Sequence, residues 1–188
     1  MPEADSDAMK GTIVKVLEID APPERVFKAF TSKKDMREWM ADDYEIDARK
    51  GGRFRMGGEE DGYIAMGEIL EIVPNDLLVY TWQMNNYDPK TGKKIPNWSD
   101  SKPTRVTVRF EKAGKGTKVT LTHEGFPERD EVFFGHLVGW DMLAGEVLKY
   151  YLEHAKEEFD RWWKENEAGW DERWQRTIEE RVKSSAGR

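Results

Sequence analysis

The sequence predicts an α+β fold in which a curved antiparallel β-sheet wraps around one long C-terminal α-helix. Apolar residues alternate between Gly-rich and Asn-rich turns over residues 44–122, which indicates a meander of strands. Over residues 131–164 they recur at steps of three or four, the period of a helix with one buried face. Because an antiparallel sheet and such a helix each need one covered face, a bent sheet around the helix satisfies both.

The N-terminal part is predicted to form one strand and two short helices. Alternating apolar residues indicate a strand over residues 12–20. Pro23 suits the first turn of the next helix, because the N–H that proline lacks has no helical partner there. Ser32 followed by Asp35 resembles a capping box and predicts the start of a second helix.

About six strands are expected after these helices. The predicted strands surround Phe54 and Met56 and cover residues 63–73, 78–84, 104–111 and 119–123. Leu78, Tyr80, Trp82 and Met84 are assigned to the inner face of their strand. A bent sheet closes imperfectly on one helix, so the remaining gap is expected to be a cavity. Residues 85–103 form a connection that is long for a hairpin, either an irregular excursion or a lid over the cavity mouth.

Three segments are expected along the chain. Residues 1–11 are acidic and polar and are predicted to be a disordered tail, and residues 12–164 form the domain. Residues 165–188 form a charged helical extension with Trp170, Trp174 and Ile178 at steps of four. Such a stripe is expected to dock on its own domain. The alternative is docking on a second subunit, which would give a homodimer.

Composition excludes several classes of function. The net charge of −7 argues against nucleic acid and anionic membranes as partners, and no segment is apolar enough to span a bilayer. With no cysteine and no signal-peptide core, a cytoplasmic protein is expected. No cofactor is predicted, because no phosphate-binding loop or dinucleotide motif occurs. No metal site is predicted, because no two histidines share ligand spacing on one element.

The three histidines are the residues with the most obvious catalytic chemistry. His123 falls on the inner face of the last strand, and His136 lies one helical turn before Trp140, so the two imidazoles can meet across the cavity. His123 is a weak candidate for a general acid or base. A hydrogen-bonded polar group in the cavity wall is the more ordinary reading, so no catalytic residue is assigned and the balance favours a protein that is not an enzyme.

An ordered set of residues resembles a known family. The set comprises Ala21-Pro22, Val26-Phe27, Trp39, Gly51-Gly52, Gly67, Pro74, the run 78–82, Gly116-Thr117, the run 121–126, Gly139-Trp140 and Leu143. Over roughly residues 12–155 the chain resembles the domain homologous to the activator of heat-shock protein 90 ATPase, in the START-related, birch-pollen-allergen-like superfamily (SRPBCC). The resemblance implies a helix-grip fold with an internal hydrophobic cavity. Members of this superfamily bind lipids, hormones and polyketides, and some are cyclases.

The predicted function is therefore binding or sequestration of a small hydrophobic or aromatic molecule, in a carrier or self-resistance role. The expected ligand-binding residues are Trp39, Phe54, Met56, Met66, Tyr80, Trp82, Met84, Leu121, His123, Phe126, His136, Trp140, Leu143 and Val147. The alternatives are a co-chaperone that stimulates a heat-shock protein 90 ATPase, and a polyketide cyclase or aromatase. Gly139 weakens its helix by about 1 kcal/mol relative to alanine, which suggests close packing or room for a ligand there.

Overall fold

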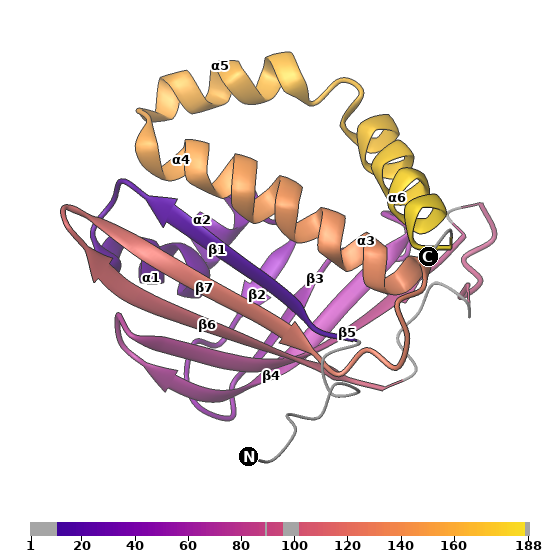
Figure 1. Cartoon of the computed structure of the whole chain (residues 1–188), viewed down its shortest axis with the longest axis horizontal. Helices are drawn as coiled ribbons and strands as arrows, with labels where there is room; N and C mark the ends of the chain where they lie inside the picture. The colour runs from indigo at the N-terminus through magenta and orange to yellow at the C-terminus, as the bar shows by residue number, and fades with distance from the viewer. Residues whose placement is uncertain (1–10, 89, 96–101, 187–188) are drawn as a thin grey trace.

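The computed structural model describes residues 11–88, 90–95 and 102–186 and shows a helix-grip fold (Figure 1). Its elements are β1 (Ile13–Ile19), α1 (Pro23–Thr31), α2 (Lys33–Trp39), β2 (Tyr44–Ile46), β3 (Arg53–Met56), β4 (Tyr63–Val73), β5 (Leu77–Asn86), β6 (Thr104–Ala113), β7 (Gly116–Glu124), α3 (Glu131–Gly139), η2 (Trp140–Leu148), α4 (Lys149–Glu153), α5 (Lys156–Asn166) and α6 (Trp170–Ala186). The predicted order of one strand, two short helices, six strands and a long helical stretch is confirmed.

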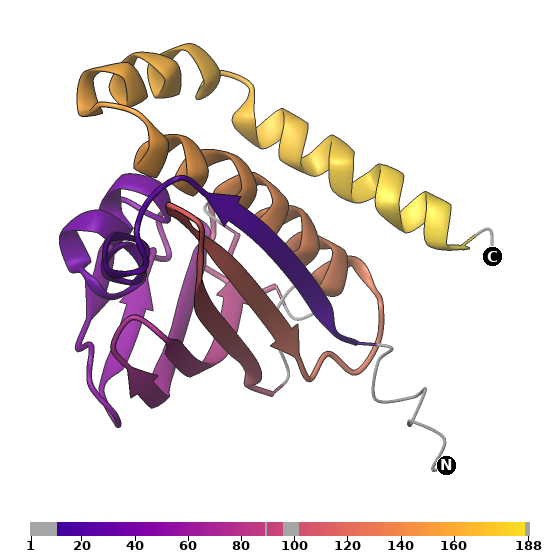
Figure 2. The same ribbon diagram turned by 60° about the vertical axis from the view of Figure 1, so that its left-hand side comes forward.

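The seven strands form one antiparallel sheet in the order β1-β7-β6-β5-β4-β3-β2. Its inner face is built by the predicted alternation: Val106 pairs with His123 and Val108 pairs with Leu121, and all four side chains are buried. The curved sheet holds the stretch α3–η2–α4 against this face, as Figures 1 and 2 show from two directions. The core of the protein therefore lies between the sheet and this helical stretch.

The two short helices begin where the sequence predicts. Pro23 occupies the first turn of α1, and the Ser32 hydroxyl oxygen caps α2 by accepting the backbone N–H of Asp35 at 3.4 Å. The Asp35 carboxylate does not return to the cap as in a capping box. It instead accepts the Tyr151 hydroxyl at 2.7 Å and pairs with Arg25 at 2.8 Å, which ties α1 and α2 to α4.

The prediction of one helix over residues 131–164 is wrong in two respects. The middle of the stretch, Trp140–Leu148, is a π-helix, and the stretch ends at Glu153. His154 and Ala155 are extended, with ψ values of 162° and 152°. The chain then reverses, so that α5 lies back over α4 and α6 runs beside α3 (Figure 1). The second helical layer thus begins at Lys156, before the predicted start of the extension at residue 165.

Aromatic stacking explains this reversal. The Tyr150 ring stacks on His154 at 3.8 Å and on Trp162 at 4.6 Å between ring centroids. Phe159 of α5 is buried and contacts the Tyr151 ring at 5.2 Å. These contacts join residues on both sides of the break. The segment 153–156 contains no glycine or proline, the residues that commonly mark the end of a helix. The break is therefore stabilised by tertiary packing rather than by a local helix-stop signal.

Two predicted segments fall partly outside the described residues. Of the tail predicted over residues 1–11, only Gly11 is described. There the prediction of disorder is wrong, because Gly11 is buried and its carbonyl accepts the Phe126 N–H at 3.3 Å. In the 85–103 connection, β5 continues to Asn86 and Tyr87 forms a bridge with Lys94. Residues 89 and 96–101 lie outside the described part, so the lid remains a prediction.

Candidate functional site

A cleft of about 790 Å³ lies where the sheet, the long helical stretch and α6 meet. Strands β3 to β5 and the end of α2 provide one side, α3 and η2 provide another, and α6 closes a third. Eight of the predicted ligand-binding residues line it: Trp39, Met56, Trp82, Met84, His136, Trp140, Leu143 and Val147. Three of these, Trp140, Leu143 and Val147, come from the π-helix, a backbone form that often occurs at functional sites.

Five other predicted residues are buried behind the cleft. Phe54 and Tyr80 border a second, nearly filled cavity of about 10 Å³, and Leu121, His123 and Phe126 are buried in the core. The rings of Trp82, His123, Phe126 and Trp140 converge. The centroid of His123 lies 4.6 Å from that of Phe126 and 6.1 Å from those of both indoles.

The placement of Met66 on the cavity wall is wrong. Its side chain is 39% exposed, and it pairs with Gln83 and Arg55 on the outer face of the sheet. In β4 the inward position belongs to the neighbouring Ala65, which is fully buried. The sequence does not show which residues of this strand face inward, because alanine is a weak hydrophobic signal and the neighbouring methionine is the more obvious core residue.

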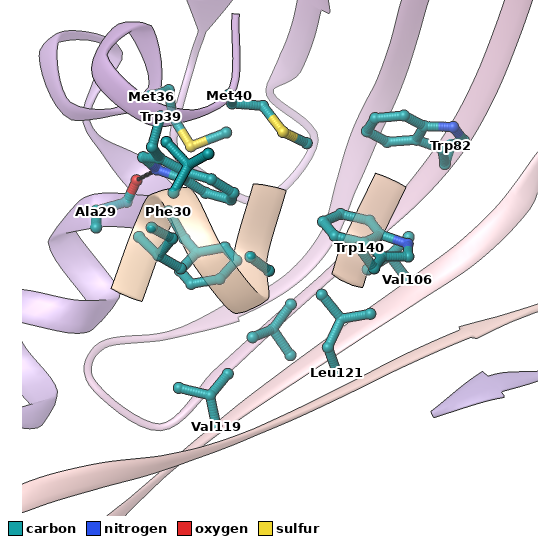
Figure 3. Close-up of a cluster of buried hydrophobic side chains, with 14 of the residues drawn as sticks. Ala29, Phe30, Met36, Trp39, Met40, Trp82, Val106, Val119, Leu121 and Trp140 are labelled. Carbon is teal, nitrogen blue, oxygen red and sulfur yellow. Dashed lines mark hydrogen bonds between the residues drawn. The ribbon is translucent and has the colours of Figure 1, made fainter. Parts of the chain in front are cut away.

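Two tryptophan–histidine pairs lie where the sheet meets α3 and η2. The Trp82 indole donates its N–H to Nε2 of His136 at 2.9 Å. The Trp140 indole donates its N–H to Nδ1 of His123 at 3.0 Å. The two imidazole centroids are 5.2 Å apart, so His123 and His136 are in contact. They do not face each other across the cavity as predicted, because His123 is buried in the core and does not line the cleft. Trp82 and Trp140 lie next to each other, as Figure 3 shows.

The hydrogen-bond partners of His136 determine which of its ring nitrogens carries the proton. Its Nδ1 lies 2.7 Å from the backbone carbonyl oxygen of Val132, which can only accept. The ring proton is therefore on Nδ1, and Nε2 is left as the acceptor for the Trp82 indole. In this tautomer His136 orients Trp82.

The same reasoning determines the tautomer of His123. Because its Nδ1 accepts from Trp140, its proton is on Nε2 and is donated to Oγ1 of Thr104 at 2.7 Å. The Thr104 hydroxyl in turn donates to the Trp82 carbonyl at 3.0 Å. Burial, with a smaller contribution from His136, lowers the pKa of His123 well below 6.5. Both ring nitrogens of His123 therefore form hydrogen bonds in the core. This arrangement matches the alternative in which His123 is a hydrogen-bonded polar group rather than a general acid or base.

Sequence reasoning did not place α6 in the site. Trp170, Trp174 and Ile178 line the cleft, and Trp163 of α5 joins them. Trp174 lies against Gly139: a β-carbon at that glycine would be 3.0 Å from the indole Cζ2. Close packing therefore explains Gly139. The spacing of the α6 residues was visible in the sequence, but the reversal at residues 154–155 that brings them to η2 was not.

The structure offers no site for a metal ion among the residues it describes, since none of their His, Asp and Glu side chains form a group of three at ligating positions. Within the same residues no helix combines the length and apolar character needed to cross a membrane.

Comparison with known proteins places the chain among relatives of one fold. It is 23% identical over 137 residues to "Activator of 90 kDa heat shock protein ATPase homolog 1" of Homo sapiens, covering 73% of this chain and 33% of the human protein. The chain thus spans about a third of that relative's length.

Two solved structures share the fold. The crystal structure of CalU16 from Micromonospora echinospora matches with a TM-score of 0.57 and 23% identity, over 94% of this chain and 86% of CalU16. The solution structure of the Aha1 dimer from Colwellia psychrerythraea matches with a TM-score of 0.60 and 20% identity, over 77% of this chain and 98% of the other. The family described as "Activator of Hsp90 ATPase homolog 1-like protein" matches residues 20–153, more than half of the sequence. The chain therefore belongs to the Activator of Hsp90 ATPase homolog 1-like family.

Proposed function

We propose that the chain binds a small hydrophobic or aromatic molecule in the cleft and holds it without turning it over. The observation that carries this proposal is the cleft itself, whose volume of about 790 Å³ lies within the range of pockets for small organic ligands. Sequestration of this kind suits a carrier or a self-resistance protein, which protects by binding rather than by chemistry.

The lining of the cleft supports an aromatic or hydrophobic occupant. The N–H groups of Trp82 and Trp140 are engaged by His136 and His123, so the two indoles contribute mainly apolar ring surface to the cleft. Trp170 and Trp174 add indoles from α6 on another side. Indoles on several sides of a cleft favour flat, polarisable ligands.

The test is a fluorescence titration of the tryptophans with a panel of flat hydrophobic molecules, using a variant that fills the cleft. Leu143→Trp adds bulk to the cleft wall, whereas Leu70→Trp adds the same bulk to half-buried Leu70 of β4, outside the cleft lining. We expect Leu143→Trp to weaken binding by about tenfold or more, equivalent to about 1.4 kcal/mol, and Leu70→Trp to bind like the wild type. A folded Leu143→Trp protein with unchanged affinity contradicts the proposal.

A co-chaperone is the second candidate function, favoured by membership of the family and by the name of the human relative. The chain corresponds to only a third of that relative, so the activity of the whole protein need not reside in it. Under this candidate, adding the chain to a heat-shock protein 90 raises the rate of ATP hydrolysis. An unchanged rate at saturating concentrations of the chain removes the candidate. The cyclase or aromatase alternative has no comparable observation in its favour.

A homodimer is also proposed, because one relative of the same fold was solved as a dimer. The apolar stripe of α6 does not provide the interface in the arrangement described, since Trp170 and Ile178 are already buried within the chain. Native mass spectrometry distinguishes the two states: a dimer peak supports the proposal, and a monomer at micromolar concentrations rejects it.

A further inference from the structure

The charged residues that line the cleft are mostly acidic. Glu38, Asp42, Asp61 and Asp171 contribute carboxylates, and Arg37 contributes a cation. The three aspartates are exposed, so they sit where the cleft meets solvent rather than at its apolar floor. An occupant therefore meets negative charge at the mouth of the cleft and aromatic rings inside it.

The arginine at the mouth is already engaged. The Arg37 guanidinium donates to the carboxylate of Glu45 at 3.1 Å and to the backbone carbonyl of Tyr44 at 3.2 Å. It also lies 3.7 Å from Asp43. Neutralised in this way, Arg37 is poorly placed to recognise an anionic ligand, because a new anion would have to displace existing carboxylates.

The aspartates differ from Arg37 in this respect. Glu38 pairs with Lys156 at 3.2 Å, but Asp42, Asp61 and Asp171 form no ion pair with any cation among residues 11–88, 90–95 and 102–186. Uncompensated carboxylates at the edge of an apolar cleft set a negative potential at its mouth and attract cations.

The negative potential of these carboxylates also acts on Tyr63 in the wall of the cleft. Its ring lines the cleft, and the pKa of its hydroxyl is raised, first by burial and then by the charges of Asp61, Asp42 and Asp43. Carboxylates from two separate segments, before β2 and before β4, therefore act on the same point.

We propose that the occupant of the cleft is a hydrophobic cation, a molecule with a flat apolar body and a protonated amine. This inference rests on the proposed ligand-binding function and specifies its chemical class. The apolar body packs against Trp82 and Trp140, and the ammonium group faces the aspartates at the mouth. Indole faces favour the same charge, because the ring quadrupole attracts cations.

The experiment compares three probes that share one body and differ in charge: pyrenemethylammonium, pyrenemethanol and pyrenecarboxylate. Each is titrated into the full chain, and tryptophan quenching gives the dissociation constant. We expect the ammonium to bind most tightly and the carboxylate most weakly. We also expect the advantage of the ammonium over the alcohol to shrink as salt is added, because screening weakens exposed charge interactions.

Charge-neutral variants show whether the aspartates cause this order. Asp42→Asn/Asp61→Asn removes two carboxylates from the mouth, and Glu71→Gln/Asp76→Asn removes two exposed carboxylates that do not line the cleft. The first pair should cut the ammonium's advantage over the alcohol by about fivefold, since each exposed ion pair contributes up to about 1 kcal/mol. The control pair should leave that advantage within about twofold of the wild type, and both should bind the alcohol as the wild type does.

The outcomes separate this inference from the proposed function. If the alcohol or the carboxylate binds as tightly as the ammonium, the cation preference is overturned while ligand binding stands. The same holds if both double variants lose the preference equally, because net charge rather than the cleft mouth is then responsible. If none of the three probes binds, the proposed function fails and this inference fails with it.

Discussion

Two walls of the cleft are held in place by different kinds of contact. In the wall formed by the sheet, α3 and η2, two buried indoles donate hydrogen bonds to two imidazoles. The α6 wall is held by apolar side chains, with Trp170 and Ile178 buried. Its ion pair, Arg173 with Glu146 at 2.7 Å, is more than a third exposed on both sides. The first wall is held by hydrogen bonds of defined geometry, whereas the second is held mainly by the burial of apolar side chains.

This difference has energetic consequences. A buried donor that loses its acceptor carries the full desolvation penalty, so the first wall tolerates little change. An exposed ion pair contributes about 0–1 kcal/mol, so α6 depends on a few apolar contacts and can open locally without breaking the core. Changes to the first wall should therefore affect global unfolding, and changes to the second should affect the docking of one helix.

The largest effect is expected from His123→Leu. The substitution keeps a similar volume but leaves the Trp140 N–H without its acceptor in the core. We expect a loss of about 3 kcal/mol in the free energy of unfolding, measured by urea denaturation. The double variant with Trp140→Phe removes the donor as well, so it should lose less than the sum of the two single losses. Additive losses would show that this hydrogen bond is not important for stability.

The same histidine is expected to make the protein sensitive to acid. The folded state holds the pKa of His123 below its ordinary value of 6.5, chiefly through burial, so the unfolded chain takes up this proton first. Its contribution to stability is present above pH 6.5 and is lost as the pH falls towards the folded value. Urea unfolding over a pH series should show a decline below pH 6.5 that is less steep in His123→Leu. Equal slopes for the two proteins would contradict this assignment.

Much of the fold could be predicted because local signals agree with the tertiary structure. Ser32 caps a helix as its sequence context indicates, and alternation along β5 to β7 identifies the inner face. The reversal at His154 could not be predicted, because it depends on the Tyr150 ring stacking on His154 and on Trp162 eight residues beyond the break. The π-helix was equally hidden, since its apolar residues also recur at steps of three and four.

The site shows the same division. Residues on the sheet and on η2, such as Trp82 and Trp140, follow from strand parity and helical period. Met66 was misplaced because Ala65 fills the inward position of β4. The α6 wall was missed because its place depends on the reversal. Periodicity tells which face of an element is buried, but not which distant element covers it.

An intermediate effect is expected from Ile178→Ala on α6. Removing this buried side chain should cost about 2 kcal/mol, the lower end of the range for Ile→Ala, because the side chain lies at a docking face rather than in the central core. Hydrogen exchange should rise selectively in α6 while the protection of β6 and β7 is kept. Glu180→Ala, at an exposed position on the same helix, is the control and should leave exchange unchanged. Equal loss of protection in the sheet would show that α6 does not open separately.

The smallest effect, and the one with the most informative sign, is expected from Gly139→Ala. Alanine favours a helix by about 1 kcal/mol, but its β-carbon would lie 3.0 and 3.1 Å from two carbons of the Trp174 ring. Displacing the indole should outweigh the gain, leaving a net loss of about 1 kcal/mol in urea unfolding or in the local opening of α6. At Gly145, a β-carbon would meet only the Trp140 carbonyl at 3.9 Å. Gly145→Ala should therefore be neutral or stabilising.

Trp174→Ala provides the decisive background for this comparison. Without the indole the clash is absent, so Gly139→Ala should change sign and stabilise the Trp174→Ala protein by up to about 1 kcal/mol. The effect of Gly145→Ala should be the same in both backgrounds, because its β-carbon does not approach Trp174. If Gly139→Ala stabilises the wild type as much as Gly145→Ala does, the Trp174 indole is displaced without a measurable cost in the free energy of unfolding. The contact between Trp174 and Gly139 then does not position the second wall of the cleft.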